Sequence, residues 1–184
     1  MVLFLGTSLT AGLGVDPEAA YPAVLQRRFD SLGLGLRAVN AGVSGETSAG
    51  LLRRLPHALH GELRVVVIET GANDGLRGLD VDTTRANIEA IVDTVRARAP
   101  GAVIVLVGME APPNMGPVFT AQFRDLWPAL ASRKRTRLVP FLLEGVGGVD
   151  TLNQDDGIHP NPAGHRVLAD VVWRGLEPLL VRSP

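Results

Sequence analysis

Short apolar runs alternate with longer amphipathic segments along the chain. The apolar residues of the short runs are nearly continuous rather than alternating, which is typical of strands buried on both faces of a sheet. The pattern predicts five strands, at Val2–Leu5, Leu36–Asn40, Val65–Thr70, Ala102–Gly108 and, more weakly, Arg137–Pro140.

The longer segments carry apolar residues at the spacing of an amphipathic helix. They predict five helices, at Pro17–Leu32, Ser48–His60, Thr83–Ala99, Val118–Arg133 and Pro162–Val181. Gly33 and Gly35 follow the first of these, as glycines often do past a helix C-terminus. Asn161 before Pro162 is a favourable start for the last helix, because asparagine caps a helix and proline suits its first turn.

Strands that alternate with helices predict one α/β domain over residues 1–184, with a five-stranded parallel sheet covered by helices on both faces. No internal repeat, low-complexity tract or linker interrupts this pattern. Ligands of such folds bind beyond the carboxyl ends of the strands. Reactive residues that directly follow a predicted strand are therefore the first candidates for a functional site.

Three of the predicted strands are followed by such residues. Ser8 lies in a glycine- and threonine-rich turn after the first strand, and the same turn would suit a capping serine or a phosphate cradle. After the second strand, Gly45 can place a backbone N–H at a reaction centre, while Thr47 or Ser48 caps the next helix. After the third strand, Asn73 carries a neutral donor, in a stretch that is also ordinary turn chemistry.

A fourth candidate group lies near the C-terminus. A general base needs an imidazole whose second nitrogen is held by an acceptor. Asp156 and His159 are three residues apart in a compact loop, and Pro160 restricts the backbone of His159 to an extended shape. One loop would thus supply both the base and its orienting acid. His165 lies inside the last predicted helix, where a solvated or capping role is expected instead.

Taken together, these stretches resemble the SGNH hydrolases, also called the GDSL esterase/lipase family. The resemblance is carried by Leu5–Gly14, Val39–Gly50, Thr70–Gly78 and Gln154–Asn161, whose spacing is compatible with the family from end to end. Within the family, the chain is most similar to the bacterial thioesterase I/protease I/lysophospholipase L1 group and to related arylesterases. The resemblance implies a flavodoxin-like three-layer α/β/α sandwich around the five-stranded sheet.

The resemblance also implies a role for each candidate residue. Ser8 would be the nucleophile, His159 the base that takes its proton, and Asp156 the acid that orients His159. The oxyanion would be held by the backbone N–H groups of Ser8 and Gly45 and by the side-chain amide of Asn73. The resemblance implies no cofactor and no metal ion.

Two positions depart from the family pattern. The first block normally reads Gly-Asp-Ser-Leu, and here threonine replaces the aspartate at Thr7. Threonine supplies no carboxylate, so the departure bears on the rigidity of the nucleophile loop and on the local field near His159. Ala72 stands where close relatives often have glycine, and its methyl group would narrow the site beside Asn73.

Apolar residues near these motifs indicate a substrate class. The candidates for substrate contact are Leu76, Leu79, Met109, Pro112 and Met115. Such residues suit an acyl chain or an aromatic acid better than a polyhydroxylated sugar, and methionine adapts to varied shapes. The alternative is that they only pack their loops down. Arg77 would suit an anionic group of the substrate, or a solvated place in its loop.

Composition narrows the chemistry further. The chain has 184 residues, 46% of them hydrophobic and 20% charged, which is the balance of a soluble globular protein. A net charge of −1 gives no basic footprint for nucleic acid. The absence of cysteine excludes disulfides, a thiol nucleophile and cysteine-ligated metals. The one lysine, Lys134, lies in a basic run that is poorly placed for a Ser–Lys dyad.

These observations predict a serine esterase that hydrolyses carboxylic esters and thioesters with short- to medium-chain or aryl groups, with lysophospholipids as a further candidate. The alternatives are a carbohydrate O-deacetylase on the same fold, a hydrolase that binds without turnover, and a flavodoxin-like binding module. We expect a small-molecule ester or thioester as partner, no nucleic acid, no stable membrane insertion, and a monomer or weak homo-oligomer. A cytoplasmic location is expected for the chain as it begins, and a periplasmic or secreted one if a leader precedes it.

Overall fold

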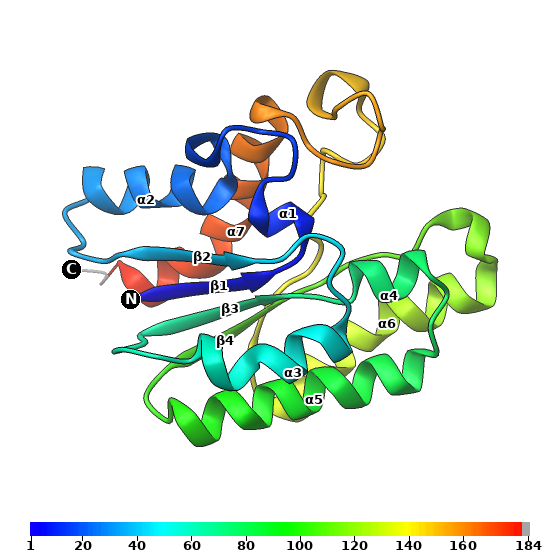
Figure 1. Cartoon of the computed structure of the whole chain (residues 1–184), viewed down its shortest axis with the longest axis horizontal. Helices are drawn as coiled ribbons and strands as arrows, with labels where there is room; N and C mark the ends of the chain where they lie inside the picture. Colours follow the sequence, from blue (N-terminus) through cyan, green and yellow to red (C-terminus); the bar gives the residue numbers. More distant parts are fainter. Residues whose placement is uncertain (182–184) are drawn as a thin grey trace.

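A five-stranded parallel sheet forms the centre of the protein. The computed structural model describes residues 1–181. The strands are β1 (Val2–Gly6), β2 (Ala38–Gly42), β3 (Val65–Glu69), β4 (Val103–Val107) and β5 (Arg137–Val139). Their order in the sheet is β2-β1-β3-β4-β5, and every neighbouring pair is parallel (Figure 1). The parallel five-stranded sheet predicted from the apolar runs is confirmed.

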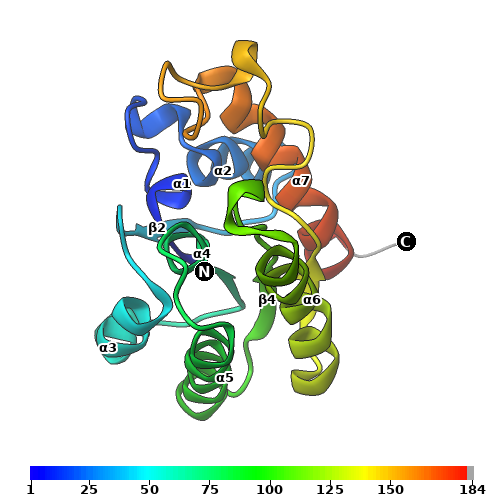
Figure 2. The same ribbon diagram turned by 90° about the vertical axis from the view of Figure 1, so that its right-hand side faces the viewer.

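Helices cover both faces of this sheet. The α-helices are α1 (Ser8–Ala11), α2 (Tyr21–Ser31), α3 (Ser48–Ala58), α4 (Ala72–Leu76), α5 (Val81–Arg98), α6 (Pro117–Lys134) and α7 (Pro162–Leu180). Three 3₁₀ turns accompany them, η1 (Pro17–Ala19), η2 (Pro113–Met115) and η3 (Asp150–Leu152). Figures 1 and 2 show α2 and α7 on one face and α3, α5 and α6 on the other, which confirms the three-layer α/β/α sandwich.

The central strands are buried along their whole length. All five residues of β1 and all five of β3 are buried, because helices cover the sheet on both sides. This explains why their sequences read as continuous apolar runs instead of alternating ones. The same burial holds most of β4, where only Val103 is exposed. The sheet is therefore a rigid base for the loops at its carboxyl edge.

The helix expected at Pro17–Leu32 is two elements, η1 and α2, separated by Ala20 in an extended conformation. One continuous helix would place Pro22 four residues after Glu18. There the proline has no N–H to donate and its ring would clash with the Glu18 carbonyl. That carbonyl accepts a hydrogen bond from Arg27 instead. The prediction of an unbroken helix is wrong for this reason.

Two short helices, α1 and α4, lie where the sequence predicts turns. Each begins just beyond a central strand, at Ser8 after β1 and at Ala72 after β3. Helices of four and five residues are too short to be stable alone, and they carry too few residues for a helical period. Both short helices are stabilised by hydrogen bonds to distant parts of the chain, α1 through Glu69 and α4 through Ser48.

The direction of the crossover connections reverses between β1 and β3. From β1 the chain crosses to β2 on one side, and from β3 it crosses to β4 on the other. In open α/β sheets, ligands bind at the point where the crossing direction reverses. Ser8 follows β1 and Asn73 lies in the helix that follows β3, so both lie at this point.

His165 of α7 is buried, with 1% of its surface exposed, so a solvated role is wrong. Its Nδ1 accepts a hydrogen bond from the backbone N–H of Tyr21 at 3.3 Å, at the first residue of α2. His165 therefore caps a helix other than its own. Burial, with a smaller contribution from the charge of His159, lowers the pKa of His165 to about 4.

The lowered pKa of His165 predicts a loss of stability in acid. Between about pH 6.5 and about pH 4 the unfolded chain binds a proton here and the folded chain does not, so stability falls as the pH falls. We expect urea unfolding to give a free energy about 2 kcal/mol lower at about pH 5 than at about pH 8 from this residue. In His165→Asn, an amide oxygen replaces the Nδ1 acceptor without titrating, and this decrease should shrink. An identical decrease in the wild type and in the variant would contradict the assignment.

Candidate active site

Ser8 begins α1 immediately above the end of β1. β1 ends at Gly6, Thr7 is extended, and Ser8 is the first residue of the short helix. The first N–H groups of a helix have no partner within the helix, so the Ser8 N–H is available to another acceptor. The half-buried Ser8 side chain thus stands at the sheet edge beside a free backbone donor.

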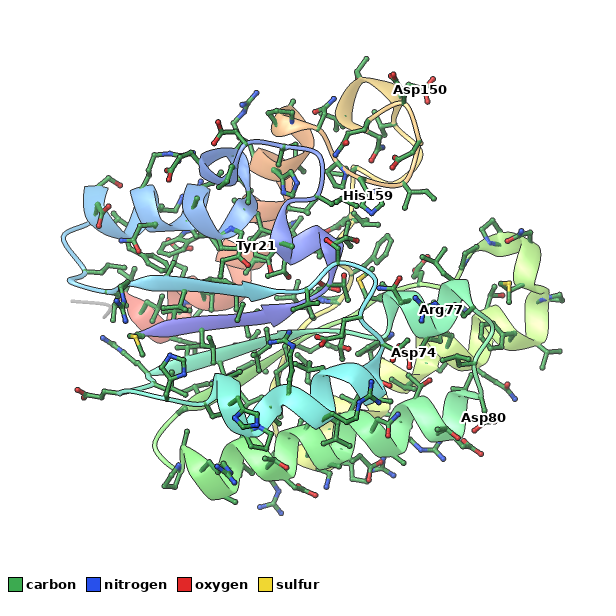
Figure 3. All side chains as sticks on the ribbon, viewed as in Figure 1. Tyr21, Asp74, Arg77, Asp80, Asp150 and His159 are labelled. Carbon is green, nitrogen blue, oxygen red and sulfur yellow. The ribbon has the colours of Figure 1, made fainter. Side chains whose placement is uncertain are left out.

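His159 and Asp156 meet Ser8 from the loop before α7. His159 Nε2 lies 3.0 Å from Ser8 Oγ, and His159 Nδ1 lies 2.6 Å from Asp156 Oδ2. With Nδ1–H donating to the carboxylate, Nε2 carries the lone pair that accepts from the serine hydroxyl. Ser8 and His159 are 151 positions apart in sequence, yet together with Asp156 they form one continuous line of hydrogen bonds. Figure 3 shows His159 at the carboxyl end of the sheet.

The loop also fixes the Asp156 carboxylate. Its Oδ1 accepts the backbone N–H groups of Ile158 and His159, each at 2.9 Å. These bonds, those of the His159 backbone and ring first and that of Ile158 next, lower the pKa of Asp156 to about 2. The carboxylate therefore stays ionised at neutral pH and can hold the His159 ring through Nδ1.

Gln154 ties the histidine loop to the serine loop. Its backbone N–H donates to the carbonyl of His159 at 2.8 Å, and its side-chain amide donates to the carbonyl of Leu13 at 2.7 Å. The same amide donates to the carbonyl of Pro160 at 3.0 Å. Leu13 lies just beyond α1, so this one side chain links the segment that carries Ser8 with the segment that carries His159.

The segment after β3 braces the loop that holds Gly45. Gly45 adopts a φ of 77°, in the left-handed region that favours glycine. Asn73 Nδ2 donates to the carbonyl of Glu46 at 3.0 Å, and Arg77 Nη2 donates to the carbonyl of Gly45 at 2.9 Å. The second Asn73 N–H remains for another acceptor. The structure thus brings Gly45 and Asn73 together, and gives Arg77 a specific contact where the sequence favoured a solvated loop residue.

Two carboxylates, those of Asp74 and Glu46, stabilise the segment that follows Gly45. Asp74, which is buried, accepts the backbone N–H of Ser48 at 2.8 Å and its hydroxyl at 2.6 Å. Glu46 forms a two-pronged ion pair with Arg54, with Nε and Nη2 each 2.7 Å from a carboxylate oxygen. Bidentate pairs of this kind restrict geometry as well as adding energy. The Gly45 loop is therefore held from two sides.

Sequence reasoning missed a buried carboxylate beneath the nucleophile. Glu69 ends β3 and is fully buried. It accepts hydrogen bonds from the backbone N–H and the hydroxyl of Thr7 and from the hydroxyl of Thr10. The departure at Thr7 therefore places a hydroxyl against a carboxylate that comes from another strand. The available signal was one acidic residue in the otherwise apolar strand β3.

The predicted substrate-contact residues differ in exposure. Leu76 and Leu79 are 46% and 40% exposed, and Pro112 and Met115 are half-buried. The Met115 methyl group lies beside Gly78, so the loop after β4 touches the segment after α4. Met109 is different, because it is 3% exposed and packs in the hydrophobic core. Contact between Met109 and a substrate stays a prediction, because a buried side chain meets a substrate only where a pocket reaches it.

Other exposed apolar side chains also lie on loops at the carboxyl edge. Leu13, Val43 and Ile158 follow α1, β2 and Asp156, with exposures of 45%, 42% and 50%.

Within residues 1–181, no three histidine or acidic side chains group in a way that would hold a metal ion. Over the same residues, no helix combines the length and apolar character needed to cross a membrane.

Comparisons with known proteins agree with this geometry. The model of the GDSL-like lipase/acylhydrolase family matches residues 4–167. Esterase TesA of Pseudomonas aeruginosa is 45% identical over 180 residues, which cover 97% of this chain and 89% of that protein. Thioesterase 1/protease 1/lysophospholipase L1 of Escherichia coli K12 is 37% identical over 97% of this chain and 84% of its own length.

Solved structures are similar over nearly the whole chain. A crystal structure of TesA superposes with a TM-score of 0.92 at 44% identity, covering 97% of this chain and 99% of that one. The psychrotrophic esterase EstA from Pseudoalteromonas sp., in a structure inhibited by monoethylphosphonate, also gives a TM-score of 0.92, at 32% identity and 98% coverage of both chains.

Proposed function

The chain belongs to the GDSL-like lipase/acylhydrolase family of serine hydrolases, and from this premise we propose that it hydrolyses esters through an acyl-enzyme on Ser8. The protein is an enzyme of the esterase class. The observation that carries the proposal is the line of hydrogen bonds from Ser8 Oγ through His159 to Asp156, at 3.0 and 2.6 Å. Such a line activates a weak hydroxyl nucleophile.

The proposed reaction has two halves. In the first, Ser8 Oγ attacks the ester carbonyl while its proton moves to His159 Nε2, and His159 then gives that proton to the leaving alcohol or thiol. In the second, water attacks the acyl carbon while its proton moves to His159 Nε2. His159 then returns that proton to Ser8 Oγ as the bond between Oγ and the acyl carbon breaks and the acid leaves. Asp156 holds the imidazole in the required tautomer and stabilises its positive charge in both halves.

The tetrahedral intermediate of each half carries a negative oxygen. In our proposal this oxyanion is bound by the backbone N–H groups of Ser8 and Gly45 and by the Asn73 amide. The support is the free position of the Ser8 N–H at the start of α1 and the bracing of the Gly45 loop by Asn73 and Arg77. Donors that are fixed before the reaction need no reorganisation when the charge develops.

The substrate class we propose is carboxylic esters and thioesters with an acyl chain or an aryl group. Exposed leucines at positions 76 and 79 support an apolar acyl contact. Similar proteins carry the names arylesterase and thioesterase 1/protease 1/lysophospholipase L1, which makes thioesters and lysophospholipids candidates. We propose one catalytic domain over residues 1–184, acting as a monomer or weak homo-oligomer.

A fluorophosphonate tests the nucleophile directly. The reagent should add to Ser8 with loss of fluoride, and mass spectrometry of the digested protein should find the adduct on the peptide that contains Ser8. A series of p-nitrophenyl esters from acetyl to decanoyl should show higher kcat/KM for the longer chains. A preference for acetylated sugars over every member of the series would instead indicate a carbohydrate O-deacetylase.

Asn73→Ala should lower kcat by about 10²–10³-fold with little change in KM, because it removes a donor that acts mainly on the transition state. Steady-state kinetics with a p-nitrophenyl ester measures the effect. Gln122→Ala is the control, since it removes an exposed side-chain amide from α6. The control should stay within about threefold of the wild type. Equal losses in both variants would contradict a specific role for Asn73.

A further inference from the structure

We propose that Glu69 is a positioning residue for the nucleophile, whose buried carboxylate fixes Thr7 and Thr10 on either side of Ser8. The proposal rests on the nucleophilic role of Ser8. Glu69 is not expected to touch the substrate, because it is fully buried below the turn that carries Ser8. It acts through the backbone of that turn and so sets where the Ser8 hydroxyl and N–H stand.

The contacts are concentrated on one oxygen of the carboxylate. Glu69 Oε2 accepts the Thr7 N–H at 2.7 Å, the Thr7 hydroxyl at 3.0 Å and the Thr10 hydroxyl at 2.8 Å. Oε1 accepts the Thr7 hydroxyl at 2.9 Å. Thr7 precedes Ser8 directly and Thr10 follows it by two residues, so the short helix is fixed at both of its ends.

The space for the carboxylate depends on a glycine. A Cβ added to Gly6 would come within 2.6 Å of Glu69 Oε2 and would overlap the Thr10 hydroxyl. No side chain fits there without displacing this cluster. The missing side chain at Gly6 therefore leaves the space that the Glu69 carboxylate of β3 and the Thr10 hydroxyl occupy, although Thr7 and Glu69 are 62 residues apart in sequence.

A second layer of hydrogen bonding supports Thr10. The Tyr21 hydroxyl lies 2.9 Å from Thr10 Oγ1, and both side chains are fully buried. If Thr10 donates to Glu69, Tyr21 donates to Thr10. Burial, followed by the charge of Glu69, raises the pKa of Tyr21, which keeps the phenol protonated as a donor. Figure 3 places Tyr21 in the helical layer above the sheet, so the cluster joins the sheet to α2.

Fold stability alone does not account for this residue. Burial raises the pKa of Glu69, and the hydrogen bonds from Thr7 and Thr10 only oppose that rise. An apolar residue of similar size would usually serve a buried strand at lower cost in free energy. The carboxylate does what no apolar side chain can, because it gathers donors from both sides of Ser8. Displacing a reacting atom by about 1 Å can lower a rate about 10²-fold.

Paired substitutions separate positioning from simple support. Glu69→Leu removes every acceptor, while Glu69→Gln can keep an oxygen at the Oε2 place and turn its amide toward the Thr7 hydroxyl. We expect kcat to be about 10- to 100-fold below the wild-type value in Glu69→Leu. In Glu69→Gln most of the wild-type kcat should be retained. KM should change less than about twofold in both variants. The rate of Ser8 labelling by a fluorophosphonate should fall with kcat.

A gentler pair keeps the test decisive if Glu69→Leu fails to fold. Thr10→Val keeps the shape and removes the hydroxyl, and Thr10→Ser keeps the hydroxyl. We expect kcat per labelled site to fall about tenfold in the first and to stay within about twofold of the wild type in the second. Thr94→Val is the control, because it removes a hydroxyl that donates to the Ala90 carbonyl within α5.

The outcomes distinguish the two proposals. If Thr10→Val and Glu69→Leu lose thermal stability but keep the wild-type kcat per labelled site, Glu69 is only a structural residue and the inference is overturned. If Thr94→Val lowers kcat as much as Thr10→Val, the effect is one of general stability and the inference also fails. If wild-type Ser8 takes no label at all, it is the proposed function that fails.

Discussion

Replacing Ser8 with alanine is expected to lower kcat by about 10⁴- to 10⁶-fold, because no other group can form the acyl-enzyme. Removing the nucleophile of a triad leaves only the contribution of substrate binding and of the oxyanion donors. The variant should fold normally, since Ser8 is half-buried and the change removes one oxygen atom. Steady-state hydrolysis of a p-nitrophenyl ester measures the loss, with the variant enzyme at a concentration high enough for its rate to exceed the uncatalysed hydrolysis of the ester.

The Ser8→Ala experiment has two controls. Ser132→Ala makes the same chemical change at an exposed position of α6 and should retain full activity. Thermal unfolding should give nearly the same Tm for Ser8→Ala as for the wild type, which separates loss of chemistry from loss of fold. Hydrolysis by Ser8→Ala at more than a few per cent of the wild-type rate would mean that another residue is the nucleophile.

The fold was predictable where burial determines the sequence pattern. The strands β1, β3 and β4 read as continuous apolar runs because both faces of the sheet are covered. The start of α7 was equally clear, since Asn161 Oδ1 accepts the N–H groups of Ala163 and Gly164 at 2.9 and 3.1 Å. A cap acts within four residues, so a local sequence is enough to reveal it.

The short helices α1 and α4 could not be read from their own sequences. The Thr7–Thr10 turn is held by Glu69, which is about 60 residues away, and the start of α4 is braced through Asp74 by Ser48, 26 residues away. Propensity and periodicity describe neighbours along the chain, whereas these helices depend on partners that only the fold brings near.

Candidate site residues divide in the same way. Asp156 and His159 are close in sequence, and a three-residue spacing in one loop was sufficient to pair them. Arg77 was not predictable in this way, because its partner is a backbone carbonyl on the neighbouring loop, and backbone atoms carry no sequence signal. The same is true of Glu69, whose position in an apolar run was visible but whose partners were not.

Asp156→Asn is expected to lower kcat by about 10²–10⁴-fold, whereas Asp155→Asn should be nearly normal. The two residues are adjacent and exposed in one loop, and the substitutions remove the same charge. Only Asp156 accepts from His159 Nδ1. An asparagine amide can donate to Nδ1 instead, which places the ring proton on Nε2, where it can no longer take the proton of Ser8 Oγ.

The pH dependence and the KM of Asp156→Asn and Asp155→Asn test whether Asp156 sets the tautomer of His159 more sharply than kcat at one pH. Wild-type Asp156 has a pKa lowered to about 2, so it stays ionised across the assay range, and the contrast between the two variants should hold at every pH tested. The KM of both variants should stay near the wild-type value, because neither carboxylate contributes to binding in the proposed mechanism. Equal losses in the two variants would show that negative charge in the loop matters and that orientation of His159 does not. A normal Asp156→Asn with a slow Asp155→Asn would reassign the acid, even though the hydrogen bond at 2.6 Å joins His159 to Asp156.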